Sequence, residues 1–170
     1  IIDRLGTEGS KDGVWIYPIE YQKAMDRLKQ AKGDTVIRLI VAANLVKGDP
    51  VLTELEMHPN RVVYQENEFV YQKIYNVPID GSNSEMLISD FLRNVNMTAI
   101  NNGILPNPLT GTVGVINGNQ IYAIEKALAE NRGKDVLISA FAAADTEVLG
   151  PLRLHIYLKN ETEQEINHEE

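Results

Sequence analysis

Cysteine is absent from the sequence, so neither disulfides nor thiolate metal sites can hold the fold together. No stretch approaches the roughly twenty consecutive apolar residues that a membrane-spanning helix needs. The chain also lacks the basic region and apolar run of a signal peptide. It opens with Ile1 in place of methionine, which predicts a fragment of a longer protein. Because disulfides and thiolate metal sites are excluded, side-chain packing must supply the stability of the fold.

Outside the C-terminal tail, positive and negative charges are nearly balanced. The net charge is -8, but residues 160–170 contain five glutamates and no lysine or arginine, and without them 16 basic side chains stand against 19 acidic ones. This balance argues against the broad basic face that backbone-driven nucleic-acid binding needs, so no nucleic-acid partner is expected. The tail is predicted to be a solvated, disordered end, with an acidic partner-binding arm as the alternative.

The first half of the chain predicts one helix followed by short strands. Apolar residues recur at helical spacing from Tyr21 to Ala31. Residues 35–43 form a β-branched and almost continuously apolar run, typical of a central strand covered on both faces. After the turn Lys47-Gly48-Asp49-Pro50, the alternating pattern predicts a hairpin partner. This partner and two further extended pieces are expected over residues 51–58, 61–64 and 69–75.

The second half predicts two helices and two longer strands. Ser82-Asn83-Ser84-Glu85 has the pattern of a capping box, opening a long helix that Gly103 ends. A second helix is expected to begin at Asn119 and to end at Gly133. The remaining segments are a short extended piece over 112–116, a buried strand over 135–144 and a half-buried antiparallel strand over 151–159.

This order of elements predicts an α/β (α+β) fold with a single mixed β-sheet and packed helices. Three antiparallel strands followed by alternating helices and strands also fit a ribonuclease-H-like layout, as an analogy that carries no function. The expected organisation is a linker or frayed segment over residues 1–13, a single globular domain over 14–159, and the disordered acidic tail over 160–170.

The loop Asp80-Gly81-Ser82-Asn83-Ser84 has an Asp-x-Ser-x-Ser spacing between a strand and a helix. In von Willebrand A-type domains such a loop places one carboxylate and two hydroxyls around a divalent cation, because hard cations prefer oxygen ligands. Here Pro78 interrupts the preceding strand, and no threonine and aspartate pair convincingly completes the shell, although Asp145 lies at a plausible strand end. We therefore favour a turn with a helix cap.

A ribonuclease-H-like nuclease needs several carboxylates around two metal ions, one of them in the middle of the first central strand. That strand carries Arg38 and no acid between Val36 and Ala43. The remaining candidates are Asp90, Asp145 and Glu147, for which solvated surface acids are the favoured interpretation. We therefore assign no catalytic, cofactor-binding or metal-binding residue.

The histidines and tyrosines are weaker candidates for functional residues than the carboxylates. Three histidines are too scattered for a zinc site: His58, His155 and His168. His155, on the polar face of the last strand, could act as a general base, but a surface or rim histidine is favoured. Three tyrosines in consecutive short strands suit either an interface or packing on a sheet: Tyr64, Tyr71 and Tyr75.

Three stretches together resemble a known family. They are Ala42-Ala43-Asn44-Leu45-Val46-Lys47-Gly48-Asp49-Pro50-Val51, Asn102-Gly103-Ile104-Leu105-Pro106, and Ala143-Ala144-Asp145 followed by Gly150-Pro151-Leu152-Arg153-Leu154. Over most of residues 31–159 the chain resembles the C-terminal domain of a bacterial family of unknown function, whose members are long, myosin-like coiled-coil proteins with an N-terminal membrane anchor. The resemblance implies a globular head on a coiled-coil stalk, cytoplasmic and near the membrane, and it implies no site residues.

These observations predict a non-enzymatic interaction or assembly module without a cofactor, whose partner is another protein or a second copy of the chain. It is expected in the cytoplasm, with membrane association only through parts of the parent protein outside this chain. The alternative is a metal-dependent nuclease or a degenerate nucleic-acid-binding domain. A third possibility is a small-ligand-binding domain, which would have a deep apolar pocket with a few converging polar groups.

Overall fold

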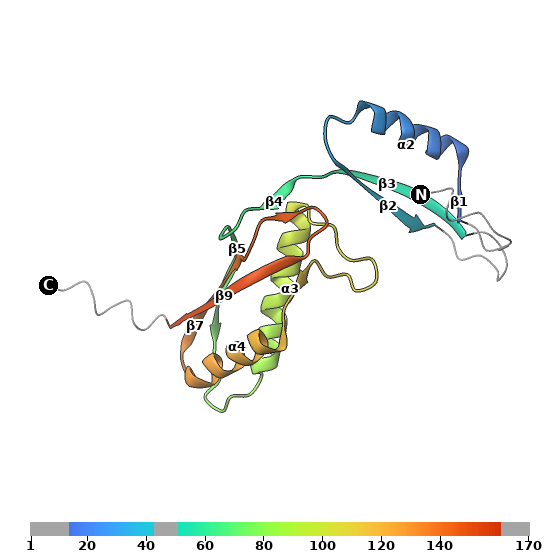
Figure 1. The fold of residues 1–170 in the computed structure, drawn as a ribbon. Coiled ribbons are helices and arrows are strands. Elements are labelled where there is room, and N and C mark those ends of the chain that lie inside the picture. Colours follow the sequence, from blue (N-terminus) through green and yellow to red (C-terminus); the bar gives the residue numbers. More distant parts are fainter. Residues whose placement is uncertain (1–13, 43–50, 161–170) are drawn as a thin grey trace. The chain divides into compact units, whose positions relative to one another are not determined.

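The computed structural model describes residues 14–42 and 51–160. Its contacts divide the chain into two compact units, Ile1–Arg61 and Val62–Glu170 (Figure 1). The single globular domain expected over residues 14–159 stays a prediction. The predicted linker over residues 1–13 and the turn over residues 47–50 lie outside the described residues. So does the predicted tail over 160–170 apart from its first residue, Asn160, which is the last residue of a strand and not disordered.

The first unit is a three-stranded sheet with one helix. Its elements are β1 (Val14–Ile16), α2 (Pro18–Gln30), β2 (Thr35–Val41) and β3 (Val51–Pro59). The strand order is β1-β3-β2, with β1 parallel and β2 antiparallel to β3. The predicted hairpin is confirmed, because β2 pairs with β3 along its whole length, from Thr35 opposite Pro59 to Val41 opposite Thr53.

β2 is not the covered central strand that its apolar run predicted. Among the described strands it lies at the edge of its sheet, and its alternate side chains Ile37, Leu39 and Val41 are 46%, 44% and 56% exposed. A continuous apolar run shows that both faces of a strand are apolar. It does not show that neighbours cover both faces.

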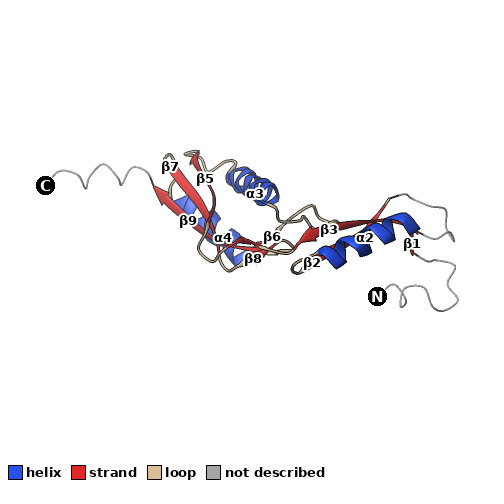
Figure 2. Cartoon of the chain, turned by 90° about the horizontal axis from the view of Figure 1, so that it is seen from above, coloured by secondary structure: helices blue, strands red, loops and turns tan. Residues whose placement is uncertain are grey.

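The second unit contains a four-stranded and a two-stranded sheet. Its elements, which Figure 2 colours by type, are β4 (Val62–Tyr64), β5 (Phe69–Asn76), α3 (Ser84–Asn102), β6 (Gly114–Val115), α4 (Gly118–Glu130), β7 (Asp135–Ala142), β8 (Thr146–Glu147) and β9 (Leu152–Asn160). In the larger sheet, of order β5-β7-β9-β6, the pairs are antiparallel except that β6 runs parallel to β9. In the smaller one, β4 pairs antiparallel with β8.

The fold is mixed α/β as predicted, but the single sheet is wrong because the described strands form three small sheets. The ribonuclease-H-like layout depended on three consecutive antiparallel strands in one sheet. The consecutive strands β3, β4 and β5 instead belong to three different sheets. Pro59 ends β3 and has no backbone N–H with which to continue a ladder, and β4 pairs with the distant β8.

The helices of the second unit differ in how they begin, and α4 starts at Gly118, one residue before the predicted Asn119. At α4 a capping box forms between Asn117 and Gln120: the Asn117 side chain accepts from the Gln120 backbone N–H over 2.9 Å, and Gln120 Oε1 accepts from the Asn117 N–H over 3.2 Å. At α3 the predicted capping box is wrong. Its N-cap is Asn83, which has a positive φ of 67° and makes no side-chain cap bond.

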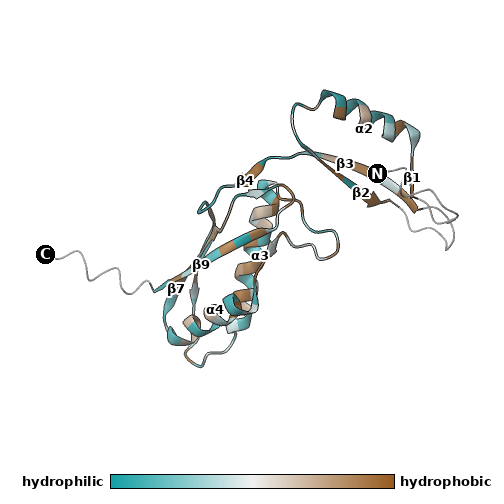
Figure 3. Cartoon of the chain, viewed as in Figure 1, coloured by the Kyte–Doolittle hydropathy of each residue, from teal (hydrophilic) through white to brown (hydrophobic). Residues whose placement is uncertain are grey.

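The core of the second unit lies between the two helices and one face of the four-stranded sheet. β7 buries every second side chain, and β9 alternates buried or half-buried with exposed side chains, so the predicted buried and half-buried strands are confirmed. Figure 3 shows the alternation of hydrophobic and hydrophilic residues along β9. The helices contribute buried side chains at helical spacing: Ile88, Phe91, Val95 and Ala99 from α3, and Ile124 and Leu128 from α4. Every residue of this core cluster lies between Tyr64 and Leu154.

Among the described residues, no helix combines the length and the apolar character needed to cross a bilayer.

Candidate interaction surface

The four-stranded sheet has a second face, opposite the buried one, which we call the outer face. Strand register places on it Phe69, Gln72, Ile74 and Asn76 from β5, Asp135, Leu137, Ser139 and Phe141 from β7, and Arg153, His155, Tyr157 and Lys159 from β9. Phe69, Ile74 and Tyr157 are 49%, 47% and 58% exposed, whereas the β7 side chains between them are half-buried. Large apolar groups thus remain accessible on this face.

A row of aromatic rings crosses three strands of the outer face. Phe69 and Phe141 are direct cross-strand partners with ring centroids 5.8 Å apart, and Phe141 lies 5.8 Å from Tyr157. Both pairs have the edge-to-face geometry that aromatic quadrupoles favour. The His155 ring lies 6.5 Å from that of Tyr157. The rings contact one another across the three strands, so the row forms a continuous apolar patch.

The charged groups of the outer face lie mainly along β9. Arg153 and Lys159 are exposed cations on either side of His155 and Tyr157, and no acid occurs in β9. The nearest acid in the register is Asp135 at the start of β7, which accepts a hydrogen bond from Asn76 Nδ2 over 2.8 Å. The outer face is therefore apolar at its centre and positively charged along one strand.

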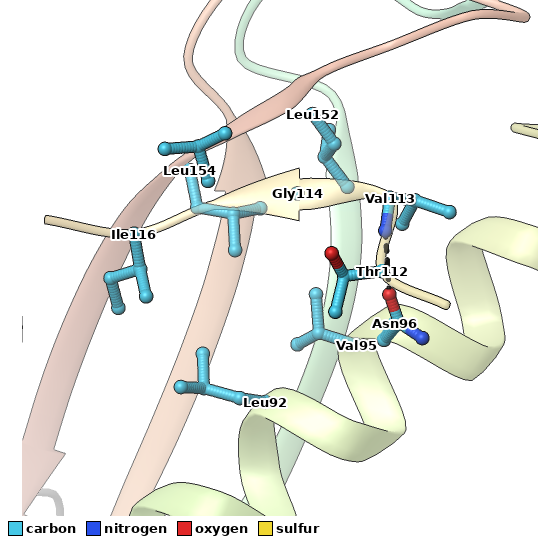
Figure 4. A pocket seen from close by; sticks show the side chains of 10 residues that line it. Leu92, Val95, Asn96, Thr112, Val113, Gly114, Ile116, Leu152 and Leu154 are labelled. Atoms are coloured by element: carbon cyan, nitrogen blue, oxygen red, sulfur yellow. Dashed lines mark hydrogen bonds between the residues drawn. The ribbon is translucent and has the colours of Figure 1, made fainter. Parts of the chain in front are cut away.

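A pocket of about 160 Å³ lies between α3 and β6 (Figure 4). Its lining is mostly aliphatic, with Leu92 and Val95 on the helix and Leu152 and Leu154 on β9. Asn96 Oδ1 accepts from the Val113 backbone N–H over 2.8 Å, and its Nδ2 donates to the Gly111 carbonyl over 3.2 Å. The pocket is smaller than the usual 300–1,000 Å³ of ligand sites, and the Asn96 amide is already used to hold the loop.

Asp90 is the centre of a polar cluster where α3 meets β5. Its Oδ2 accepts from Lys73 Nζ over 2.7 Å and from the Tyr75 hydroxyl over 2.8 Å, and its Oδ1 accepts from Arg93 over 2.8 Å. The hydrogen bonds from Lys73, Tyr75 and Arg93 hold the pKa of Asp90 well below its usual range. Burial, followed by the hydrogen bond to Asp90, raises the pKa of Tyr75. These donors give Asp90 a structural role in joining helix to strand.

The three carboxylates considered for a nuclease site are not brought together. Asp90 is held by its three donors, and Asp145 Oδ1 accepts from the Glu66 backbone N–H over 2.8 Å. Glu147 lies in β8, in the two-stranded sheet. Within the described ranges, no three histidine, aspartate or glutamate side chains are grouped so that they could hold a metal ion.

The loop that begins at Asp80 forms a turn. Asp80 Oδ1 accepts from the Ser82 backbone N–H over 2.9 Å, and this hydrogen bond lowers the pKa of Asp80. Ser84 Oγ donates to the Gly81 carbonyl over 3.2 Å. The turn interpretation is confirmed, whereas the helix cap assigned to Ser82 is wrong because the N-cap is Asn83.

The described histidines lie at the surface or are partly exposed, whereas the three tyrosines considered above pack in or against the core. His58 Nε2 lies 3.4 Å from Glu56 Oε2 in the first unit, His155 is exposed on the outer face, and His168 lies outside the described residues. Tyr64 and Tyr75 are buried in the core, and Tyr71 packs against it. The Tyr64 hydroxyl accepts from Asn102 Nδ2 over 2.6 Å, which ties β4 to α3. Packing on the sheet is therefore the role that these tyrosines have here.

Sequence reasoning missed the phenylalanines of the outer face. Residues 135–144 are apolar at nearly every position, so their pattern did not distinguish the buried Ala140 from the outward Phe141. Phe69 was expected only as the start of a short strand. The alternation over residues 151–159 was the one signal that a face with His155 and Tyr157 points away from the core.

Comparison with protein-family models, with curated proteins and with solved structures finds no match to this chain. The functional conclusion therefore depends on the surfaces of the molecule itself.

Proposed function

We propose that the chain is a non-enzymatic interaction or assembly module whose outer face binds a protein surface. The aromatic row formed by Phe69, Phe141 and Tyr157 carries this proposal. Aromatic side chains supply large contact area with few rotatable bonds, and they are enriched in protein interfaces and their energetic centres. A contiguous exposed apolar patch of this kind is a recurring mark of an interaction site.

The charges along β9 indicate the chemistry of the partner. Arg153 and Lys159 flank the aromatic row, and no acid of β9 neutralises them. A complementary surface has apolar side chains over the rings and carboxylates over the two cations, because opposite potentials favour encounter and fix the register of docking. We propose a protein surface of that composition as the occupant.

The resemblance to the coiled-coil family supports a wider context for the same function. In that context the chain is the globular C-terminal head of a longer coiled-coil protein in the cytoplasm, and the stalk would bring several heads close together. Such proximity raises the effective concentration of weakly binding surfaces without any new contact.

Photo-crosslinking in cells that make the full-length protein tests the proposed function. Benzoylphenylalanine placed at Tyr157 on the outer face is expected to give one defined protein adduct. The same group placed at Leu109, 93% exposed in the loop before β6, serves as the control and is expected to give none. Changing Phe69 to serine, at the exposed end of the aromatic row, is expected to weaken the Tyr157 adduct.

The purified partner must then bind the purified chain, and the Phe69→Ser variant must bind it more weakly. Identical adducts from both positions, or no adduct from Tyr157, would contradict the outer face as the binding surface. Substrate turnover by the purified chain would contradict the non-enzymatic assignment.

A further inference from the structure

The strand β9 has an edge that other described strands leave largely unpaired. β7 occupies one side of β9 from Leu154 to Asn160. On the other side, β6 pairs only with Leu152 and Arg153. Among the described strands, none borders this side beyond Arg153, which leaves more than half of β9 as a sheet edge. Exposed sheet edges are templates for pairing with another chain.

Backbone geometry identifies the groups that face this edge. The Ala143 N–H donates to the Arg153 carbonyl over 2.8 Å, so Arg153 and every second residue after it bond to β7. The N–H and C=O groups of Leu154, Ile156 and Leu158 therefore point the other way. The Leu154 carbonyl confirms this direction, because it accepts from Gln120 Nε2 of α4 over 2.9 Å.

A pocket of about 220 Å³ lies beside the same edge. It is lined by Gln120, Ala123 and Ile124 of α4 and by the four consecutive residues His155, Ile156, Tyr157 and Leu158 of β9. Consecutive strand residues point to opposite faces, so a pocket that contacts all four must open at the strand edge. Ala123 is exposed, and its small side chain leaves room between α4 and β9.

We propose that this pocket and edge receive an extended segment of the partner, which alternates apolar and acidic residues and pairs with β9 as an added strand. This inference rests on the proposed function as an interaction module and names the partner's binding element. Main-chain bonds to Ile156 and Leu158 provide affinity, and the side chains of the added strand provide specificity. Apolar residues of the segment enter beside Ile124 and Ile156.

Charge complementarity selects the acidic residues of the segment. On the outer face, the added strand lies beside the line formed by Arg153, His155 and Lys159, which contains no acid, and the residues lining the pocket include none either. A second copy of β9 is a poorer occupant, because antiparallel pairing about Ile156 would place Arg153 opposite Lys159. Like charges directly opposite each other on paired strands are destabilising.

The probe for this site is a fluorescent, end-blocked heptapeptide that alternates glutamate and valine, titrated into the full chain by anisotropy. Saturable binding is expected, and the lysine-valine heptapeptide is expected to bind at least about tenfold more weakly. Ala123→Trp fills the pocket from an exposed helix position and is expected to abolish binding. Ala129→Trp, also exposed on α4 but outside the pocket lining, is the matched control and is expected to bind as the wild type does.

N-methylation of the peptide tests strand pairing without any change to the protein. In an added strand, alternate N–H groups point to β9 and the others point away. Methylating one alternate set is therefore expected to abolish binding, and methylating the other set is expected to preserve it. Equal loss from both sets, equal binding of the lysine peptide, or unchanged binding by Ala123→Trp would overturn the inference.

Peptide binding tests the added strand at β9, and the Tyr157 crosslink tests the outer face, so the two proposals can fail separately. If neither heptapeptide binds while the Tyr157 crosslink and its Phe69 dependence persist, the strand-addition inference is wrong and the outer-face function stands. If the crosslink is also absent, both are wrong.

Discussion

The Tyr75 hydroxyl donates to Oδ2 of Asp90 over 2.8 Å and so joins β5 to α3. Lys73 donates to the same oxygen, and Arg93 binds the other one. The carboxylate therefore collects donors from the strand and from its own helix. Because all three donors favour the charged form, folding lowers the pKa of Asp90.

This arrangement predicts a pH-dependent effect of Asp90→Asn. A carboxylate whose pKa is depressed on folding stabilises the fold above its unfolded pKa of about 3.9, and that contribution is lost as the pH falls through the folded pKa. The variant is therefore expected to melt at a lower temperature than the wild type at pH 7. The difference should shrink progressively below about pH 4. Thermal unfolding followed by circular dichroism from pH 7 to pH 2.5 measures both.

The control is Glu130→Gln in α4. Glu130 lies 4.0 Å from Lys126, and both side chains are about two-thirds exposed, so this surface pair contributes little. A melting difference for Asp90→Asn that stays constant across the acid range would show that lost packing, and not lost charge, causes the destabilisation.

The division of the chain predicts that residues 62–160 fold without the first unit. All members of the hydrophobic core cluster lie in this segment, and the first unit contributes none of them. The fragment is expected to unfold cooperatively in urea, with a free energy within about 1 kcal/mol of that for the corresponding transition in the full chain. A fragment without a cooperative transition would show that its core depends on residues before Val62.

For the fragment 14–61 the expectation is the opposite. Among its described residues only Ala24, Val36 and Thr53 are buried, whereas several large apolar side chains are exposed. A unit of this size with so little buried surface falls short of the burial that offsets chain entropy. We expect no cooperative unfolding transition from it in isolation.

The sequence pattern predicted local elements well and their assembly poorly. The hairpin of β2 and β3 follows from alternation and a turn, and β9 from a strict period of two, because both are set by neighbouring residues. The pairing of β4 with β8 joins residues more than eighty positions apart. No local pattern in Val62–Tyr64 specifies that partner, so the expected single sheet was wrong.

The candidate surface also combines a local feature that the sequence predicted with features that depend on strand pairing. Polar residues on alternate positions of β9 predicted a face directed away from the core. Its aromatic character depends on Phe69 and Phe141, which become neighbours only when β5 pairs with β7. The free edge of β9 depends on β6 being only two residues long. Both features arise from tertiary pairing, which the sequence pattern left open.

Asn96→Ala tests how the loop before β6 is held. Asn96 accepts from the N–H of Val113, a residue only 5% exposed, and donates to the carbonyl of Gly111. Removing the amide leaves a buried N–H without its partner, which is expected to cost about 1–3 kcal/mol of unfolding free energy. Urea unfolding measures the cost. Met97→Ala, at the exposed neighbouring position of α3, is the control and is expected to change the free energy of unfolding by less than about 0.5 kcal/mol. Equal effects of the two substitutions would show that the Asn96 hydrogen bonds do not hold the loop.

Two glycines are predicted to respond to alanine with opposite signs. A Cβ on Gly114 would lie 3.0 Å from the Leu152 carbonyl oxygen, which is a tight contact with backbone, so the two strands must move apart by a few tenths of an ångström to admit it. Gly114→Ala is therefore expected to push β6 away and to cost about 1–3 kcal/mol. Gly118, the first residue of α4, has nothing within 4 Å of such a Cβ, and Gly118→Ala is expected to stabilise by about 0.5 kcal/mol by restricting the unfolded chain.

Amide hydrogen exchange in the Gly114→Ala and Gly118→Ala variants tests whether β6 stays paired with β9. If β6 separates from β9 in Gly114→Ala, the amide hydrogens of Val115 and Leu152 exchange faster with solvent, whereas those of β7 and the paired side of β9 keep their protection. Gly118→Ala is expected to leave all of these rates unchanged. Unchanged exchange at Val115 in Gly114→Ala would mean that the backbone absorbs the added methyl group without releasing β6, and it would contradict the expected separation of the two strands.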